Sequence, residues 1–223
     1  MTLRDAWDGL LLLLYPRRAV CMGCGSPAGC ERDWLCEDCR LLLPKLWLGP
    51  QPLPEVPEAA GAAFAYLYAG PVKGVARRLK YGGVYRLADD MAGDMVRAYR
   101  GMLPTGVDLV TFVPMHPRRL RKRGYNQAAL LARGVAKRLD LPCEALLRRT
   151  RNARQQARLN RKERLRNLKG GFACEGDAVG KRIVLVDDIC TTGATMRVCA
   201  QTLLTAGAAS VYVLCYGRAI VKR

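Results

Sequence analysis

The sequence contains a single histidine and only 19 acidic residues against 37 basic ones. It also lacks an apolar run that could cross a bilayer, because the five leucines at 10–14 are far fewer than the roughly 20 residues a span needs. Asp5 and Asp8 precede this run and Pro16 follows it, which argues against a secretory signal peptide. We therefore expect no membrane span and a cytoplasmic location, with residues 3–15 forming a short amphipathic helix.

The shortage of acidic residues leaves a formal net charge of +18. Most of this excess lies in residues 117–169, which carry 18 Lys or Arg residues but only three Asp or Glu residues. A charge concentrated in this way indicates a polyanionic partner rather than a general solubilising surface. No aromatic residue lies between Tyr125 and Phe172, so this stretch is expected to follow a phosphate backbone without stacking on bases.

Ten cysteines in a chain expected in the cytoplasm favour metal binding or reduced thiols over disulfides. Cys21 and Cys24, followed by Cys36 and Cys39, form two Cys-x-x-Cys pairs that suit a closed, structural Zn²⁺ site. A redox pair is the alternative, but two such pairs in one short segment favour zinc. Cys30 is not needed as a ligand. The other cysteines are expected in the core: Cys143, Cys174, Cys190, Cys199 and Cys215.

The chain divides into an N-terminal helix and cysteine unit (1–48), a proline-rich linker (49–60) and a larger domain (61–223). Strands that alternate with helices predict an α/β fold with a mostly parallel sheet flanked by helices. The expected strands are 62–68, 108–113, 183–186 and 211–215, and the expected helices are 71–80, 85–100, 124–139 and 194–206.

The most informative stretch is 183–195, where four apolar residues run into two adjacent carboxylates, Asp187 and Asp188. A small, hydroxyl-rich turn and a helical pattern follow. Ligands of open α/β sheets bind at the carboxyl ends of strands, and a Thr/Gly-rich turn at a helix N-terminus offers N–H groups and hydroxyls to a phosphate. Neighbouring carboxylates can hold ribose hydroxyls or a hydrated Mg²⁺. The turn consists of Thr191, Thr192, Gly193, Ala194 and Thr195.

This segment resembles the phosphoribosyl pyrophosphate (PRPP) motif of type I phosphoribosyltransferases. The resemblance implies that Asp187 and Asp188 contact the ribose 2′ and 3′ hydroxyls, and that the turn 191–195 wraps the 5′-phosphate. Mg²⁺ would accompany PRPP. A plain buried strand with an ordinary helix N-cap would leave the acidic pair and the Thr-rich turn together unexplained.

A second strand-to-helix turn, at 114–127, is expected to open on the same edge of the sheet as Asp187. Arg118 and Arg123 are candidates for contacts with diphosphate oxygens. His116, the only histidine, is either a structural residue or a catalytic candidate near the pyrophosphate.

Taken in order, the motifs resemble the ComF family (ComFC or GntX-like proteins) over nearly the whole chain. They are the four-cysteine unit, Leu79-Lys80-Tyr81-Gly82-Gly83, the stretch 113–127 and the Asp-Asp motif. The resemblance implies a zinc finger, a type I phosphoribosyltransferase-like domain and a role in DNA uptake and natural transformation. It leaves open whether the phosphoribosyl site is catalytic.

Three functions compete on this basis. The favoured one is handling of incoming single-stranded DNA, with PRPP or another phosphoribosyl ligand bound and with DNA-uptake or recombination proteins as partners. The second is a metabolic phosphoribosyltransferase acting on a base or amine, and the weakest is a zinc-ribbon regulator on duplex DNA. The alternative for the basic stretch is an ordinary solvent-exposed charged helix with no binding role. The candidate DNA-binding residues of this stretch are Arg148, Arg149, Arg151, Arg154, Arg158, Arg161 and Lys162.

Overall fold

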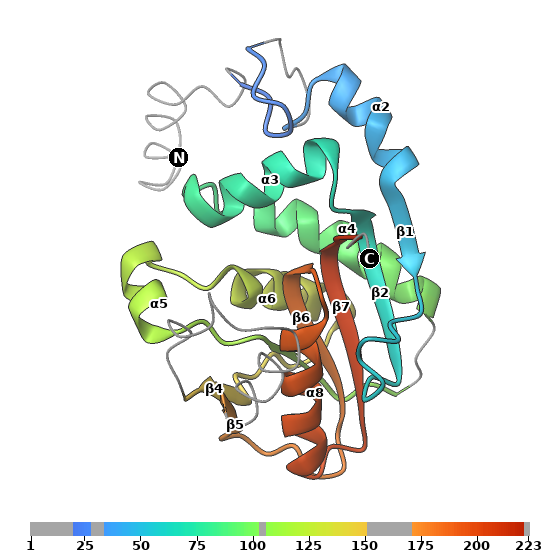
Figure 1. The fold of residues 1–223 in the computed structure, drawn as a ribbon, viewed down its shortest axis with the longest axis vertical. Coiled ribbons are helices and arrows are strands. Elements are labelled where there is room, and N and C mark those ends of the chain that lie inside the picture. Colours follow the sequence, from blue (N-terminus) through green and yellow to red (C-terminus); the bar gives the residue numbers. More distant parts are fainter. Residues whose placement is uncertain (1–19, 28–33, 103–105, 151–170, 221–223) are drawn as a thin grey trace, which may run out of the picture.

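The computed structural model describes residues 20–27, 34–102, 106–150 and 171–220. Its main sheet has five strands in the order β1-β2-β7-β6-β3 (Figure 1). The edge strand β1 runs antiparallel to β2, and the other neighbouring pairs are parallel. The strands are β1 (Trp47–Pro50), β2 (Gly61–Leu67), β3 (Leu109–Phe112), β6 (Arg182–Cys190) and β7 (Ser210–Arg218).

Helices cover both faces of this sheet, with α8 on one side and α4 and α6 on the other (Figure 1). Neighbouring residues of a strand point to opposite faces. In β6, Val184 and Val186 accordingly pack in the core with α4 and α6, whereas Ile183 and Leu185 pack in the core with α8. The helices are α2 (Glu37–Leu46), α3 (Gly70–Tyr81), α4 (Leu87–Met102), α5 (Pro117–Arg123), α6 (Gln127–Leu139) and α8 (Ala194–Thr205).

This arrangement confirms the predicted α/β fold with a mostly parallel sheet flanked by helices. Four features were not expected from the sequence: the helix α2, the edge strand β1, the short helix α5, and a separate two-stranded antiparallel sheet. That small sheet pairs β4 (Leu147–Arg149) with β5 (Phe172–Cys174). Residues 3–15, which the sequence predicts as a helix, lie outside the described residues.

The cysteine unit packs directly on α3, and two glycines make the close approach possible. A Cβ placed on Gly74 would lie 1.7 Å from the carbonyl oxygen of Gly23, so no larger side chain fits in helix α3 at that position. The Nη1 of Arg78, one turn further along α3, donates to the Met22 carbonyl over 2.7 Å. The cysteine unit therefore helps to fix the position of α3, so a loss of its structure would also affect this helix.

The residues after β1 pack against the main sheet rather than extending into solvent. The Nε of Arg197 in α8 lies 3.0 Å from the Glu58 carboxylate, and the Nη1 of Arg218 donates to the Pro52 carbonyl over 2.8 Å. The division at 1–48, 49–60 and 61–223 stays a prediction. Among the described residues, no helix combines the length and the apolar composition that a bilayer crossing requires.

Candidate functional site

The two adjacent carboxylates lie within β6, near its C-terminal end. The sequence placed the end of the strand at Val186, but pairing with β7 continues, with Asp187 opposite Cys215 and Cys190 opposite Arg218. Pairing with β3 ends at Val186, and beyond it the parallel pairing with β7 alone keeps the backbone extended. The carboxylates therefore extend from a fixed strand, which limits where a ligand can meet them.

Asp188 is 4% exposed and faces Lys80 at the end of α3, with 2.6 Å between Lys80 Nζ and Asp188 Oδ2. Burial alone would lower the pKa of Lys80, but the charges of Asp188 and Asp187 raise it above its usual value. Lys80 therefore stays protonated and neutralises much of the negative charge of the pair.

The surroundings of Asp187 disfavour its ionised form. Burial, reinforced by the charge of Asp188, raises the pKa of Asp187 well above its usual value. One Asp187 oxygen accepts from the Asp188 backbone N–H over 2.8 Å, which favours the ionised form. A cation or hydroxyl donors that approach Asp187 would relieve the repulsion within the pair.

The turn after β6 brings backbone N–H groups to the start of α8. Gly193 has a left-handed backbone with φ of 71°, and a Cβ there would meet Glu55 and Val56 at 3.1 Å, so glycine is required. Thr191 and Thr192 are exposed, and Thr192 Oγ1 accepts from the Ala194 N–H over 3.5 Å. Free N–H groups at a helix N-terminus favour an anionic group such as a phosphate.

The second predicted turn does open beside the carboxylates. Phe112 pairs with Val186, and the Val113 N–H donates to the Val186 carbonyl over 3.0 Å, so residues 114–116 leave the sheet next to Asp187. His116 is the N-cap of α5, where its Nδ1 accepts from the Arg118 N–H over 3.1 Å. Partial burial and the charges of Arg149 and Arg118 lower the pKa of His116 below its usual value. A neutral imidazole suits this acceptor role.

Replacing His116 by Ala should therefore lower the free energy of unfolding by about 1 kcal/mol, the usual cost of losing an N-cap acceptor. His116→Asn, which supplies a side-chain oxygen at the same place, should recover most of that loss in urea denaturation. Equal destabilisation by both variants would contradict the capping role. A loss of ligand binding in the stable Asn variant would instead indicate that the imidazole contacts the ligand.

The arginines predicted around the site take different positions. Arg118 is exposed on α5, whereas Arg123 donates to Gln127 Oε1 over 2.5 Å and lies over the Tyr81 ring. Arg148 forms an ion pair with Glu175, and Arg149 lies over the Phe172 ring. The other predicted DNA-binding residues lie outside the described residues: Arg151, Arg154, Arg158, Arg161 and Lys162.

Lys80 had no predicted role in the site, although the structure places it against Asp188. From the sequence, Lys80 was noted only as one residue of the stretch 79–83, which is part of the family resemblance. A lysine near the end of an amphipathic helix is ordinarily a solvated residue, and its partner is 108 positions away in the chain. Only the packing of α3 beside β6 shows the contact.

The four predicted cysteine ligands come together, with all their Sγ atoms within 4.8 Å of one another. Backbone N–H groups of Gly23 and Cys36 point at Cys21 Sγ at 3.3 and 3.2 Å, as expected around thiolates. Cys21, Cys36 and Cys39 are buried and Cys24 is exposed. The donor set fits a tetrahedral metal ion. Cys30 lies outside the described residues.

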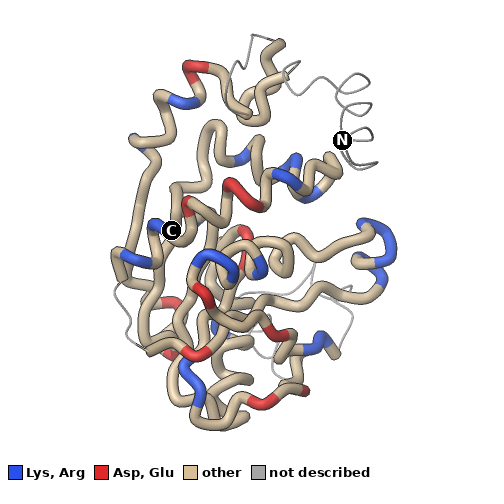
Figure 2. Tube along the Cα trace, turned by 180° about the vertical axis from the view of Figure 1, so that it is seen from behind, with Lys and Arg blue, Asp and Glu red and all other residues tan. Residues whose placement is uncertain are grey.

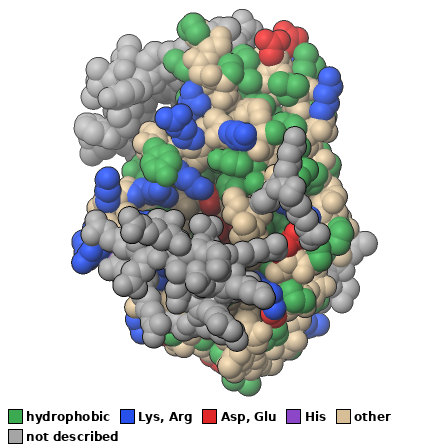
Figure 3. All heavy atoms as spheres, in the orientation of Figure 1, with side chains coloured by type: hydrophobic (Ala, Val, Ile, Leu, Met, Phe, Trp, Pro, Cys, Tyr) green, Lys and Arg blue, Asp and Glu red, His purple; other side chains and the backbone are tan. Residues whose placement is uncertain are grey.

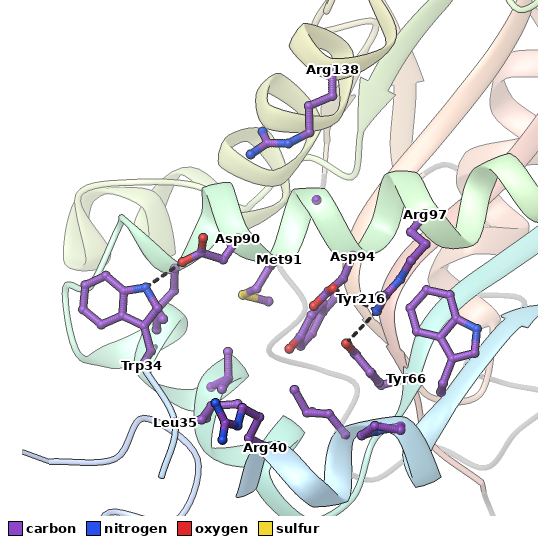
Figure 4. Close-up of a pocket in the computed structure, with 16 residues that line it drawn as sticks. Trp34, Leu35, Arg40, Tyr66, Asp90, Met91, Asp94, Arg97, Arg138 and Tyr216 are labelled. Atoms are coloured by element: carbon purple, nitrogen blue, oxygen red, sulfur yellow. Dashed lines mark hydrogen bonds and ion pairs between the residues drawn. The ribbon is translucent and has the colours of Figure 1, made fainter. Parts of the chain in front are cut away.

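A cavity of about 1070 Å³ lies on the α4 face of the sheet (Figure 4), and neither carboxylate of the pair lines it. Arg97 organises it: the guanidinium contacts Asp94 and the Tyr66 hydroxyl at 3.2 and 3.3 Å and lies 4.1 Å from the centre of the Trp47 ring. None of the residues predicted from the sequence as ligand contacts lines this cavity, so the two regions are separate.

Comparisons with known proteins agree with this geometry. Residues 126–221 match the family model described as Phosphoribosyl transferase domain. DNA utilization protein YhgH of Escherichia coli (strain K12) is 33% identical over 158 residues, which cover 69% of this chain and 70% of that protein. Competence protein ComFC of Bacillus subtilis (strain 168) is 30% identical over 145 residues, which cover 65% of this chain and 58% of that protein.

Solved structures are more distant. The match to "Structure of the allosteric regulatory enzyme of purine biosynthesis" has a TM-score of 0.39 and 26% identity. It covers 57% of this chain but only 25% of that one, so the chain spans about a quarter of the length of the enzyme.

Proposed function

The chain belongs to the ComF family of competence and DNA utilization proteins, and on that premise we propose that it handles incoming single-stranded DNA during natural transformation. We further propose that its phosphoribosyltransferase-like site binds Mg²⁺–PRPP or a related phosphoribosyl ligand. The names of its relatives, which refer to DNA utilization and competence, support the first part. In this role it would act in the cytoplasm beside DNA-uptake or recombination proteins.

The observation that carries this proposal is helix α5 at the rim of the carboxylate site. This helix has five basic residues among seven and no acidic residue in its first turn, and its N-cap lies at the end of the turn that leaves β3 beside Asp187 (Figure 2). Such a density of exposed cations attracts a phosphate backbone. The same rim therefore serves both a diphosphate and a DNA strand.

The phosphoribosyl ligand would be held by the chain's own groups. Asp187 and Asp188 would accept hydrogen bonds from ribose hydroxyls, and the N–H groups at the start of α8 would face the 5′-phosphate. Lys80 Nζ lies 2.6 Å from Asp188 Oδ2 and supplies a counter-charge to that carboxylate. Because the pKa of Asp187 is raised, binding that needs its ionised form is favoured as the pH rises.

Mg²⁺ bound with the diphosphate would neutralise phosphate charge and stabilise the leaving group if transfer occurs. The carboxylate pair would lie near the Mg²⁺ ion. Arg118 and Arg119, at the start of α5, would lie near the diphosphate. We propose Zn²⁺ for the four-cysteine cluster, where it would have a structural role because four thiolates leave no open coordination position.

Neutralising the exposed cations of α5 should weaken DNA binding in a salt-dependent way. For Arg118→Gln/Arg121→Gln/Lys122→Gln we expect the slope of log K against log salt to fall by about 2, at roughly 0.7 per lost phosphate contact on a single strand. Fluorescence anisotropy with a labelled single-stranded oligonucleotide at several salt concentrations measures this slope.

The matched control removes the same charge elsewhere. Arg100, Arg133 and Lys137 are exposed on α4 and α6, and their replacement by Gln should leave the slope nearly unchanged. If both triple variants change the slope equally, the net charge of the chain rather than α5 attracts the DNA. An unchanged slope in the α5 variant would remove this helix from the DNA site.

A metabolic phosphoribosyltransferase is the second candidate function, and the intact carboxylate pair favours it. Transfer to a base or amine usually requires a group that can move a proton near the acceptor. The only histidine is engaged as the N-cap of α5 through Nδ1. Release of diphosphate from PRPP in the presence of nucleobases or amines would support the enzyme, and binding without release would support the DNA-handling role.

A further inference from the structure

Two tyrosines, one at the end of α3 and one just after it, are far more exposed than their apolar rings would favour. Tyr81 is 75% exposed and Tyr85 is 54% exposed. They flank the turn at Gly82 and Gly83, where Gly83 has φ of 66° and open space around it. The turn ends α3 and lets both rings stand on the surface.

Both rings are held in place by residues at the junction of α5 and α6. The Arg123 guanidinium lies 4.9 Å from the centre of the Tyr81 ring, and the rings of Tyr85 and Tyr125 meet edge to face with centres 4.7 Å apart. The Tyr125 hydroxyl donates to the Leu79 carbonyl, which ties this junction to α3. We call Tyr81, Tyr85, Tyr125 and Arg123 the tyrosine patch.

The surroundings of the tyrosine patch carry positive charge. Residues 81–86 contain no Asp or Glu, and α5 supplies four further cations next to Arg123 in the sequence. Figure 3 shows hydrophobic and basic side chains side by side on this face of the molecule. Lys80, the neighbour of Tyr81, forms the ion pair with Asp188, so the patch adjoins the carboxylate site.

We propose that the tyrosine patch is a base-stacking platform for single-stranded DNA, with α5 contacting the phosphates; this inference rests on the proposed DNA-handling function. Proteins that bind single strands combine a basic groove with aromatic rings on which bases stack. The sequence argued against stacking because the basic stretch has no aromatic residue. The structure supplies the exposed rings from a different segment, residues 81–85 at the end of α3 and in the turn after it, which contacts the junction of α5 and α6.

The charge of the patch decides against an apolar protein partner as its occupant. Stacked Tyr and Arg surfaces flanked by cations match a chain that alternates flat bases with negative phosphates. They match a hydrophobic protein surface poorly, since the cations would have to lose water without gaining a counter-charge. A strand on the patch would also lie next to the phosphoribosyl site.

The test compares a thymidine oligonucleotide with an abasic oligonucleotide of the same length, about 15 nucleotides, by fluorescence anisotropy. The wild-type chain should bind the thymidine strand about tenfold more tightly, since stacking contributes to affinity base by base. Tyr81→Ala/Tyr85→Ala should bind the two strands alike, with the salt slope kept. Tyr81→Phe/Tyr85→Phe, which keeps the rings, should restore the preference for bases.

Each other outcome has a definite meaning. If the wild-type chain binds both strands equally, the DNA is held by its phosphates alone and the platform is refuted, while the DNA-handling function stands. If the wild-type chain binds neither strand, the proposed function itself fails. If the Ala variant weakens binding to both strands equally and keeps the tenfold ratio, the tyrosines do not stack on bases. Thermal melting of each variant checks that the exposed positions have left the fold intact.

Discussion

Calorimetric titration is expected to show Mg²⁺–PRPP binding by the wild-type chain and roughly 10- to 150-fold weaker binding by Asp187→Asn. Hydrogen bonds to a charged group contribute about 1.5–3 kcal/mol each, so losing the charge that faces the ribose has this effect. Asparagine keeps the shape of the side chain and removes the repulsion with Asp188, which favours an intact fold. Binding should also weaken as the pH falls, because the raised pKa of Asp187 lets a proton compete with the ligand.

Asp188→Asn should lose binding as well, but it carries a second cost. It leaves the partly buried Lys80 ammonium without its carboxylate, and breaking such a pair costs up to about 3 kcal/mol. Melting temperatures therefore have to accompany the titrations, and Asp177→Asn, an exposed carboxylate before β6, is the matched control. A folded wild-type chain that binds no PRPP would contradict the phosphoribosyl site and leave DNA binding as the function to pursue.

The central part of the candidate site could be predicted from the sequence because it is local. A buried strand, two carboxylates and a Thr/Gly-rich turn follow one another within 183–195, and their order in the chain nearly fixes their order in space. The predicted end of the strand, at Val186, was wrong because β7 continues to pair with Ile189 and Cys190. Pairing partners of this kind are not visible in a local sequence pattern. The run of apolar residues stops at the carboxylates, whereas the extended strand continues to Cys190.

The rest of the site depends on contacts between distant segments. Lys80 meets Asp188, and Tyr81 meets Arg123, only because α3 lies beside β6 and α5. Helix α5 itself was missed because its seven residues carry a single apolar side chain, Leu120, and thus no amphipathic pattern. The edge strand β1 contains Gly49 and Pro50, which usually indicate a turn; Pro50 fits because the strand lies at the edge of the sheet.

Gly74→Ala should separate the cysteine unit from α3 and lower the free energy of unfolding by about 3 kcal/mol or more. In most exposed helix positions this change is stabilising, since alanine favours a helix by about 1 kcal/mol over glycine. Here the new Cβ would lie 1.7 Å from the Gly23 carbonyl oxygen, which is backbone and cannot rotate away. Urea denaturation and limited proteolysis near residues 20–50 measure the loss of stability and of docking.

Gly93→Ala in α4 is the matched control for this effect. A Cβ there would meet only Arg138 Nε, at an ordinary 3.7 Å, so the same substitution should stabilise the chain by about 0.5–1 kcal/mol. The Gly74 variant should still bind the proposed Zn²⁺, because all four cysteines remain, yet bind Mg²⁺–PRPP more weakly as α3 and Lys80 shift away from Asp188. If the variant keeps wild-type stability and PRPP affinity, the cysteine unit does not support α3, and its role lies outside the phosphoribosyl site.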